Sequence, residues 1–309
     1  MNVAVLGAGT MGRGIAQVAG MAGHDVTLRD VDDRRVRDGI DAIEVTLSEG
    51  IDRGKVDAET ASETLERIEG TIDLESAVED VDLVVEAVPE DLELKADVLS
   101  STEDATPRDA VVASNTSSLP VTELVAALDR PERGIGLHFF NPVHIMSLVE
   151  VVVAEQTAAE VVDVAHEFVE SIDKVAIEVA DSPGFSSSRL GVGLGVEAMR
   201  MVEEGVASPR DVDRSMTLGY NHPVGPIELG DVVGLDVRLD ILEHLRTELG
   251  ERFRPPQILK RKVRAGNLGK KTGEGFYRWE NGEIVGTVDG PGDRGRTNGT
   301  NRADSGGQP

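Results

Sequence analysis

The stretch GAGTMGRGIA, residues 7–16, follows the apolar run Val3–Leu6 and decides the fold of the first half of the chain. A glycine turn with G-x-G-x-x-G spacing, between a strand-like run and a helical segment, is typical of a dinucleotide site. The first glycine permits a tight turn, the second lets the backbone approach a diphosphate, and the third allows helix and strand to pack closely. The N–H groups that begin the helix favour phosphate. The predicted contacts are Gly7, Gly9, Thr10, Met11 and Gly12.

An acidic residue follows at the distance that this pattern requires. Asp30 ends the second apolar run, where a carboxylate accepts hydrogen bonds from the adenosine ribose. The same carboxylate would repel a 2′-phosphate, so NAD is predicted in preference to NADP. The alternative is a glycine turn beside a surface aspartate, without a ligand.

Short apolar runs alternate with helix-like stretches as far as residue 182. This alternation predicts an α/β fold of the Rossmann type, a doubly wound and mostly parallel sheet with helices on its faces. Residues 33–69 are polar, have a helical period and are too long for one crossover helix, so we expect a helical arm over about 33–70. The apolar runs are Val3–Leu6, Val26–Leu28, Leu83–Val85, Val111–Ala113, Ile135–Leu137, Leu148–Val153 and Val175–Val179.

The second half of the chain has a different pattern. After Ser182-Pro-Gly184 no strand-like run is apparent, and we predict an all-helical C-terminal domain over 183–279 after an NAD-binding domain over 1–182. From about Glu280 the chain has scarcely any large apolar residue, which predicts a disordered tail over 280–309. The predicted helices are Arg189–Glu204, Pro209–Leu218, Glu228–Leu249 and Pro256–Ala265.

The composition disfavours several partners. The 309 residues carry a formal net charge of −26, which would repel nucleic acid and anionic membranes. No apolar run approaches the roughly 20 residues of a membrane span. The chain enters a strand at residue 2, which leaves no room for a targeting segment, so we expect a cytoplasmic protein. Cysteine is absent, so disulfides and thiolate chemistry are excluded.

The acidic residues are spread along the whole chain, and lysines are few beside arginines. This pattern indicates a surface adapted to concentrated salt, as in a halophile. The alternative is an acidic protein from an ordinary environment.

Two polar side chains interrupt neighbouring apolar runs near the middle of the chain. His138 ends one run, Pro142 turns the chain, and the returning run contains Glu150. We expect the return to bring the carboxylate beside the imidazole, where it would fix the tautomer and raise the basicity of the other ring nitrogen. The alternative is a satisfied polar cluster in a core.

The loop Ser114-Asn-Thr-Ser-Ser118 ends another strand at the same edge of the sheet, where open α/β sheets bind ligands. Its hydroxyls and amide suit a nicotinamide and a small oxygen-bearing substrate. They would also serve to cap the helix that follows Leu119. A nicotinamide and a base that meet at one carbinol are what an alcohol dehydrogenase requires.

Together these motifs resemble the L-3-hydroxyacyl-CoA dehydrogenase family, which includes 3-hydroxybutyryl-CoA dehydrogenases. The resemblance covers about 1–279. It implies an NAD domain with a helical arm that helps to bind CoA, a helical domain that forms a homodimer, and an acyl-CoA substrate. The motifs are GAGTMGRGIA, VVEAVPED, SNTSSL, HFFNPV, LVEVV, DSPGF, GPIELGDVVGLD and GKKTGEGFY.

The resemblance implies roles for individual residues. His138 would be the general base and Glu150 its partner. Ser117 would hydrogen-bond the substrate oxygen, and Asn141 would hold the nicotinamide region and orient the substrate. Cofactor contacts beyond the glycine turn and Asp30 are implied at Glu90, Lys95, Ser117, Asn141 and Lys271.

The implied substrate contacts include two departures from the family pattern. Ser48 and Lys55, in the arm, match positions that contact CoA. Ser188 stands where the family places an asparagine near the thioester, and Ser147 where it has a lysine. We expect these differences to affect the rate and the acyl preference, with the reaction class unchanged.

The predicted reaction is the NAD-dependent oxidation of (S)-3-hydroxyacyl-CoA to 3-oxoacyl-CoA, in fatty acid beta-oxidation or short-chain acyl-CoA metabolism. One alternative is a dehydrogenase of a free 3-hydroxy acid such as gulonate, against which Phe139-Phe140 and the implied CoA contacts count. Another is an NAD(H)-binding protein without catalysis, against which the complete set of catalytic candidates counts. No metal site is predicted.

Overall fold

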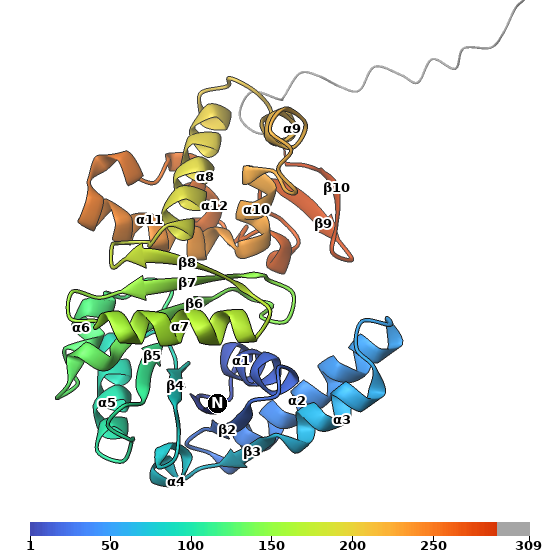
Figure 1. Ribbon diagram of the computed structural model, residues 1–309. Coiled ribbons are helices and arrows are strands. Elements are labelled where there is room, and N and C mark those ends of the chain that lie inside the picture. The colour runs from blue at the N-terminus through green and yellow to red at the C-terminus, as the bar shows by residue number, and fades with distance from the viewer. Residues whose placement is uncertain (289–309) are drawn as a thin grey trace, which may run out of the picture. The chain divides into compact units, whose positions relative to one another are not determined.

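The computed structural model describes residues 1–288. The chain forms two compact units, residues 1–186 and the residues from 187 onward (Figure 1). The first contains the larger sheet and the helices that pack on it, and the second contains the remaining helices and a two-stranded sheet.

The first unit is built on an eight-stranded sheet of order β3-β2-β1-β4-β5-β6-β7-β8. Every neighbouring pair is parallel except β6 and β7. The doubly wound, mostly parallel sheet predicted from the sequence is therefore confirmed. The strands are β1 (Asn2–Leu6), β2 (Asp25–Arg29), β3 (Ile68–Thr71), β4 (Leu83–Glu86), β5 (Val111–Ser114), β6 (Gly134–Phe139), β7 (Leu148–Val153) and β8 (Val175–Ala180).

Helices cover both faces of this sheet, because alternate side chains of each strand enter different cores. In β1, Val3 and Val5 pack in a cluster with residues of α1 and α7, whereas Ala4 and Leu6 pack with residues of α4. Residues of α5 and α6 pack against β5 on this second face. The helices are α1 (Thr10–Met21), α4 (Leu74–Val78), α5 (Leu92–Glu103), α6 (Val121–Val125) and α7 (Ala159–Ser171).

The residues of the predicted arm form a hairpin of two helices, α2 (Asp33–Asp52) and α3 (Ala58–Glu66), which extends beyond the sheet in Figure 1. The Asp32 side chain caps α2 by accepting hydrogen bonds from two backbone N–H groups. Gly54 turns the chain with a positive φ of 64°. The last residues of the range are not helical, because they form the edge strand β3, in which only Ile68 is fully buried. One buried residue gives no alternating signal, so the sequence pattern missed this strand.

The second unit contains five α-helices in its described residues, and one predicted helix is divided. Instead of a single helix over Glu228–Leu249, the chain breaks at Gly234, whose φ of 108° favours glycine and ends the first helix. The helices are α8 (Ser187–Glu203), α9 (Pro209–Gly219), α10 (Pro226–Val233), α11 (Leu235–Leu249) and α12 (Gln257–Arg264).

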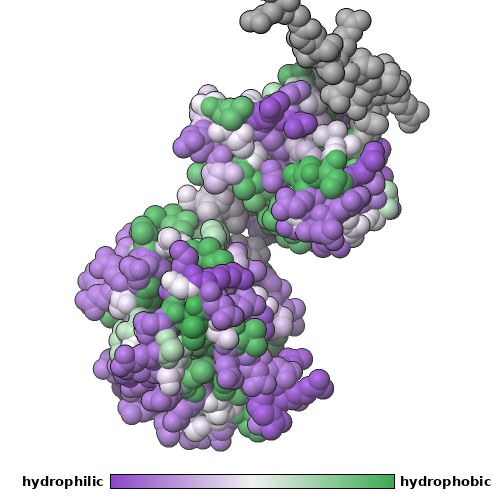
Figure 2. All heavy atoms as spheres, turned by 90° about the vertical axis from the view of Figure 1, so that its right-hand side faces the viewer, coloured by the Kyte–Doolittle hydropathy of each residue, from purple (hydrophilic) through white to green (hydrophobic). Residues whose placement is uncertain are grey.

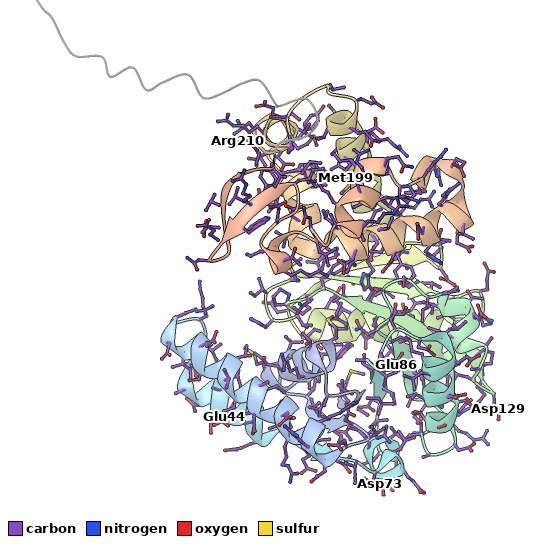
Figure 3. The ribbon with its side chains drawn as sticks, turned by 180° about the vertical axis from the view of Figure 1, so that it is seen from behind. Glu44, Asp73, Glu86, Asp129, Met199 and Arg210 are labelled. Carbon is purple, nitrogen blue, oxygen red and sulfur yellow. The ribbon has the colours of Figure 1, made fainter. Side chains whose placement is uncertain are left out.

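The predicted helical character of the C-terminal domain is confirmed, except that a two-stranded antiparallel sheet follows its helices. β9 (Tyr277–Glu280) pairs with β10 (Glu283–Thr287). Tyr277 and Trp279 are buried in one cluster with Met199 of α8, which Figure 3 labels. The predicted disordered tail is therefore wrong over 283–287, where exposed side chains concealed the strand. Residues 289–309 lie outside the described part of the chain.

Candidate active site

His138 and Glu150 form a hydrogen-bonded pair inside the first unit. They are directly opposed in the antiparallel pair β6–β7, so both side chains lie on the same face of the sheet. Nδ1 of His138 lies 2.7 Å from Oε2 of Glu150. Only 6 % of His138 and 0 % of Glu150 is exposed, so the pair is desolvated. Since the carboxylate accepts from Nδ1–H, Nε2 carries the unshared pair that can accept a proton.

Residues distant in the sequence complete this pair. The backbone N–H of Ser186 donates to Oε1 of Glu150 at 3.1 Å, so both carboxylate oxygens accept hydrogen bonds. The rings of Phe140 and Phe185 lie 4.4 and 5.7 Å from the imidazole, measured between ring centroids. The Phe139 side chain is instead buried in the core, so only one residue of the Phe-Phe pair flanks the imidazole.

The hydroxyl-rich loop after β5 is held beside β6 by Asn115, whose side-chain oxygen accepts from the N–H of Phe139 at 3.0 Å. No side chain of this loop caps α6, and the N–H of Thr122 in its first turn donates instead to Asp181 at 2.8 Å. The hydroxyls of the loop turn to Glu90. Oε1 of that carboxylate lies 2.7 Å from the Thr116 hydroxyl and 2.9 and 3.1 Å from the N–H groups of Ser117 and Ser118.

Burial opposes ionisation of Glu90, yet the charge of Lys95 and the hydrogen bonds from the loop lower its pKa below the usual value. Glu90 is therefore a carboxylate that organises the loop. Ser117, the predicted substrate contact, is exposed at the surface of the same loop.

Glu90 is in contact with a buried ion pair between Lys95 and Glu86. Nζ of Lys95 lies 2.8 Å from Glu86, 3.1 Å from the carbonyl of Val88 and 3.4 Å from Glu90. Glu86, labelled in Figure 3, also accepts from the hydroxyl of Ser114 at 2.6 Å. The Lys95 side chain is 1 % exposed. Its ammonium group therefore faces these protein oxygens.

A cavity of about 620 Å³ lies over the glycine turn and contains the predicted dinucleotide contacts at residues 7–11, together with Asp30. A Cβ at Gly12 would lie 1.7 Å from the carbonyl oxygen of Gly7, which explains the close packing of helix on strand. A Cβ at Gly9 would meet nothing within 4 Å, so the open space needed by a diphosphate is present there. Asp30 accepts from the N–H of Ala8 at 2.9 Å and lines the same cavity.

Asn141 lines a second cavity of about 170 Å³, between α1, α2 and the loop after β6. Ser48 and Lys55, the predicted CoA contacts, are exposed on the arm. A lysine is also found close to Ser147, where the family lysine is missing. Nζ of Lys174 donates at 2.7 Å to the carbonyls of Val143 and Met146.

Two predicted site residues belong to the second unit. Lys271 forms an ion pair of 2.6 Å with Asp236 of the same unit. Ser188 is half-buried in the first turn of α8. Residues 1–288 contain no cluster of side chains able to hold a metal ion. Within the same range, no helix has the length and apolar composition to cross a bilayer.

The sequence matches two domain families along almost all of its described length. Residues 2–182 match the NAD binding domain of 3-hydroxyacyl-CoA dehydrogenase, and residues 184–279 match its C-terminal domain. The chain belongs to the 3-hydroxyacyl-CoA dehydrogenase family. The glycine turn and the paired histidine and glutamate are thus parts of a dehydrogenase of this family.

Full-length relatives agree with this assignment. The chain is 42 % identical over 284 residues to a probable 3-hydroxybutyryl-CoA dehydrogenase of Bacillus subtilis, covering 90 % of this chain and 97 % of the relative. It is 40 % identical over 278 residues to the 3-hydroxybutyryl-CoA dehydrogenase of Clostridioides difficile, covering 90 % and 99 %. The crystal structure of the (S)-3-hydroxybutyryl-CoA dehydrogenase PaaH1 from Ralstonia eutropha matches with a TM-score of 0.87 and 37 % identity, covering 91 % and 99 %.

The family and the cavity agree on the cofactor. The open space at Gly9 and the carboxylate of Asp30 fit the diphosphate and the ribose of NAD. NAD is the cofactor, and the chain is an NAD-dependent oxidoreductase.

Proposed function

We propose that the chain oxidises (S)-3-hydroxyacyl-CoA to 3-oxoacyl-CoA, reversibly, with His138 as the general base. The observation that carries this proposal is the 2.7 Å contact of Nδ1 with Glu150, which leaves Nε2 as the proton acceptor. NAD, when bound, supplies the hydride acceptor for C3. Relatives of similar length are named for the same reaction class.

The protein's own residues handle the proton. Nε2 of His138 takes the proton of the 3-hydroxyl group, and the imidazolium that results is stabilised by the carboxylate of Glu150. In the reverse direction the same nitrogen returns the proton to the reduced carbonyl. A base placed in this way contributes about 10²–10⁴-fold to the rate. The rings of Phe140 and Phe185 keep water from the imidazole, which strengthens its attraction to the carboxylate.

The loop after β5 positions the reacting oxygen. We assign Ser117 to a hydrogen bond with the 3-oxygen, because the residue is exposed while its backbone N–H and its hydroxyl both donate to Glu90, which holds it in place. Lys95 acts on this loop through Glu90, as a positioning residue. Asn141 would orient the substrate and the nicotinamide, and Lys271 would contribute to the cofactor site.

The arm is the proposed CoA site. Ser48 and Lys55 are exposed there, and Lys55 is a cation that suits a phosphate-bearing ligand on an acidic protein. The named relatives favour a short acyl chain, as in 3-hydroxybutyryl-CoA. We therefore place the chain in short-chain acyl-CoA metabolism or beta-oxidation.

The reaction is tested by following NADH oxidation by the purified chain with acetoacetyl-CoA, in low salt and in molar KCl. A parallel assay follows NADH oxidation with the 3-oxo form of gulonate, and a separate measurement follows NADH binding in the absence of substrate. We expect turnover with the CoA thioester alone. Turnover with the free acid alone would establish the alternative dehydrogenase, and NADH binding without any turnover would establish a non-catalytic protein.

Ser188 is the proposed determinant of acyl preference. A serine has one hydroxyl close to the backbone, whereas an asparagine has two donors and a longer reach. Replacing Ser188 by asparagine should therefore raise kcat/KM for acetoacetyl-CoA. Kinetics of this variant over short and long acyl chains decide the point, and a loss of activity with every chain would show that serine already suits the natural substrate.

A homodimer is proposed through the second unit. Large apolar side chains are exposed on its helices and on the segments that join them, and Figure 2 shows hydrophobic residues in green on the visible face of this unit. Among them are Leu190, Val206, Leu218, Tyr220 and Val232. Light scattering of the protein as it elutes from a size-exclusion column would give the mass of a monomer if the proposal is wrong.

The proposed location is the cytoplasm, which cell fractionation tests.

A further inference from the structure

The two cavities of the first unit share part of their wall. The larger cavity, over the glycine turn, and the smaller one, between α1, α2 and the loop after β6, are both lined by Thr10 and Arg13. Arg13 lies in the first turn of α1, and the next residue, Gly14, allows close packing, since a Cβ there would lie 2.9 Å from the side chain of Val143. Arg13 therefore stands at the boundary between the proposed dinucleotide and CoA sites.

Arg13 differs from the other arginines around the larger cavity. Arg35 faces Asp30 at 3.6 Å, and Nε of Arg29 donates to the carbonyl of Ile72 at 3.3 Å. Arg13 is half-buried, and its guanidinium makes no hydrogen bond or ion pair with any residue of 1–288, although its backbone N–H donates to the carbonyl of Gly9. A guanidinium kept without a carboxylate, on a chain with a net charge of −26, is available for an anionic ligand.

The cations Lys174 and Arg53 lie near His144, at the edge of the smaller cavity. His144 lines it, and burial together with the charges of Lys174 and Arg53 lowers the pKa of this histidine, with Glu49 opposing them. The remaining polar lining consists of hydroxyl and amide groups from Thr46, Gln17 and Asn141. The carboxylate that lines the larger cavity beside Asp30 is Asp38, whose partner is Arg34 at 3.6 Å. Among the residues that line the smaller cavity, Arg13 is thus the cation, and none of them is a carboxylate.

We propose that Arg13 binds the diphosphate of an adenine-nucleotide ligand at this boundary. The planar guanidinium donates two parallel hydrogen bonds to phosphate oxygens, which an ammonium group does not reproduce. The diphosphate belongs either to the dinucleotide in the larger cavity or to CoA in the smaller one. The CoA assignment rests on the proposed function, whereas the dinucleotide assignment rests on the family alone.

The experiment compares Arg13→Gln and Arg13→Lys with Arg37→Gln, which removes the same charge from an exposed position of α2 paired with Asp33. Three quantities are measured on the full chain. They are the Kd of NADH from its fluorescence, the KM of acetoacetyl-CoA, and the KM of acetoacetyl-N-acetylcysteamine, which has no diphosphate. Thermal unfolding with each variant shows that the fold is intact.

We expect Arg13→Gln to weaken NADH binding or to raise the KM of acetoacetyl-CoA by on the order of tenfold, with the KM of the truncated thioester unchanged. Arg13→Lys should recover part of the loss, and Arg37→Gln should show none. A change in the Kd of NADH identifies the dinucleotide as the ligand of Arg13, and a change in the KM of acetoacetyl-CoA identifies CoA. The proposal is overturned if neither moves, if the truncated thioester is equally affected, or if Arg37→Gln has the same effect. If the parent chain turns over no CoA thioester, the proposed function fails, and the Kd values of NADH and of free CoA by calorimetry still decide the role of Arg13.

Discussion

His138 and Glu150 occupy directly opposed positions of the β6–β7 pair, so the backbone itself brings Nδ1 to 2.7 Å from Oε2. The second oxygen of the same carboxylate accepts from the N–H of Ser186. Both oxygens accept hydrogen bonds, so donors on two sides hold the carboxyl group in one orientation beside the imidazole. This geometry is the basis for the proposed roles of the two residues as a base and its counterion.

Replacing Glu150 by glutamine tests this relationship. The amide has no charge to stabilise an imidazolium. Its NH2 group must also face either Nδ1–H of His138 or the N–H of Ser186, both of which are donors. We expect kcat to fall by about 10–100-fold. In the double variant with His138→Gln, the loss should be no greater than for His138→Gln alone, because the residues act as a unit. Additive losses in NADH oxidation would contradict the pairing.

Asp30→Ala tests the choice of cofactor. The carboxylate lies in the cavity wall, tied to the N–H of Ala8, where a ribose hydroxyl of NAD would reach it. Loss of a charged acceptor costs about 1.5–3 kcal/mol. We expect weaker NAD binding and a smaller preference over NADP, measured as the ratio of kcat/KM values. A parent chain that already prefers NADPH would disprove the role of this residue.

His24 should make stability depend on pH. Its ring contacts the Ser171 hydroxyl at 2.7 Å and the N-terminal amine at 3.2 Å, and burial followed by the charge of that amine lowers its pKa. Between the two pKa values, His24 is therefore protonated in the unfolded chain and neutral in the folded chain. The free energy of unfolding should therefore fall as pH drops below about 6.5 and through the lower pKa of the folded state. Urea titrations at several pH values give the free energy of unfolding of the parent and of His24→Gln. Only the parent should show this fall, and an equal dependence of the free energy on pH in both proteins would refute the assignment.

Salt should stabilise the chain. With a net charge of −26, the surface carboxylates repel one another, and at 0.01 M salt the Debye length is about 30 Å. We expect the melting temperature to fall on dialysis and to recover in molar KCl. An unchanged melting temperature across that range would remove the argument for adaptation to salt.

The strands that carry the site could be predicted because they are buried on both faces and read as continuous apolar runs, as in Val111–Ala113 and Leu148–Val153. The histidine and the glutamate could be paired because only a turn separates their strands. The edge strands β3 and β10 were missed because most of their side chains are exposed. Strands are predicted from apolar residues that become buried, so a strand with few buried residues gives no such signal.

Contacts between distant segments could not be predicted. Nothing in the sequence around residue 150 indicates that Ser186 would donate to the carboxylate or that Phe185 would flank the imidazole. The burial of Lys95 could not be predicted either, although its contacts span only a short stretch of the chain. Its ammonium group is enclosed by Glu86 and Val88, which only the meeting of β4 and α5 brings together.

The most direct test of the account is the measurement of kcat and of the NADH Kd on the same preparation of His138→Gln. Glutamine keeps the bulk of the side chain and a hydrogen-bonding group but cannot take the proton of the hydroxyl. The account predicts that kcat with acetoacetyl-CoA falls by about 10²–10⁴-fold while the Kd of NADH stays nearly unchanged. A kcat within threefold of the parent value would contradict the assignment of His138 as the base.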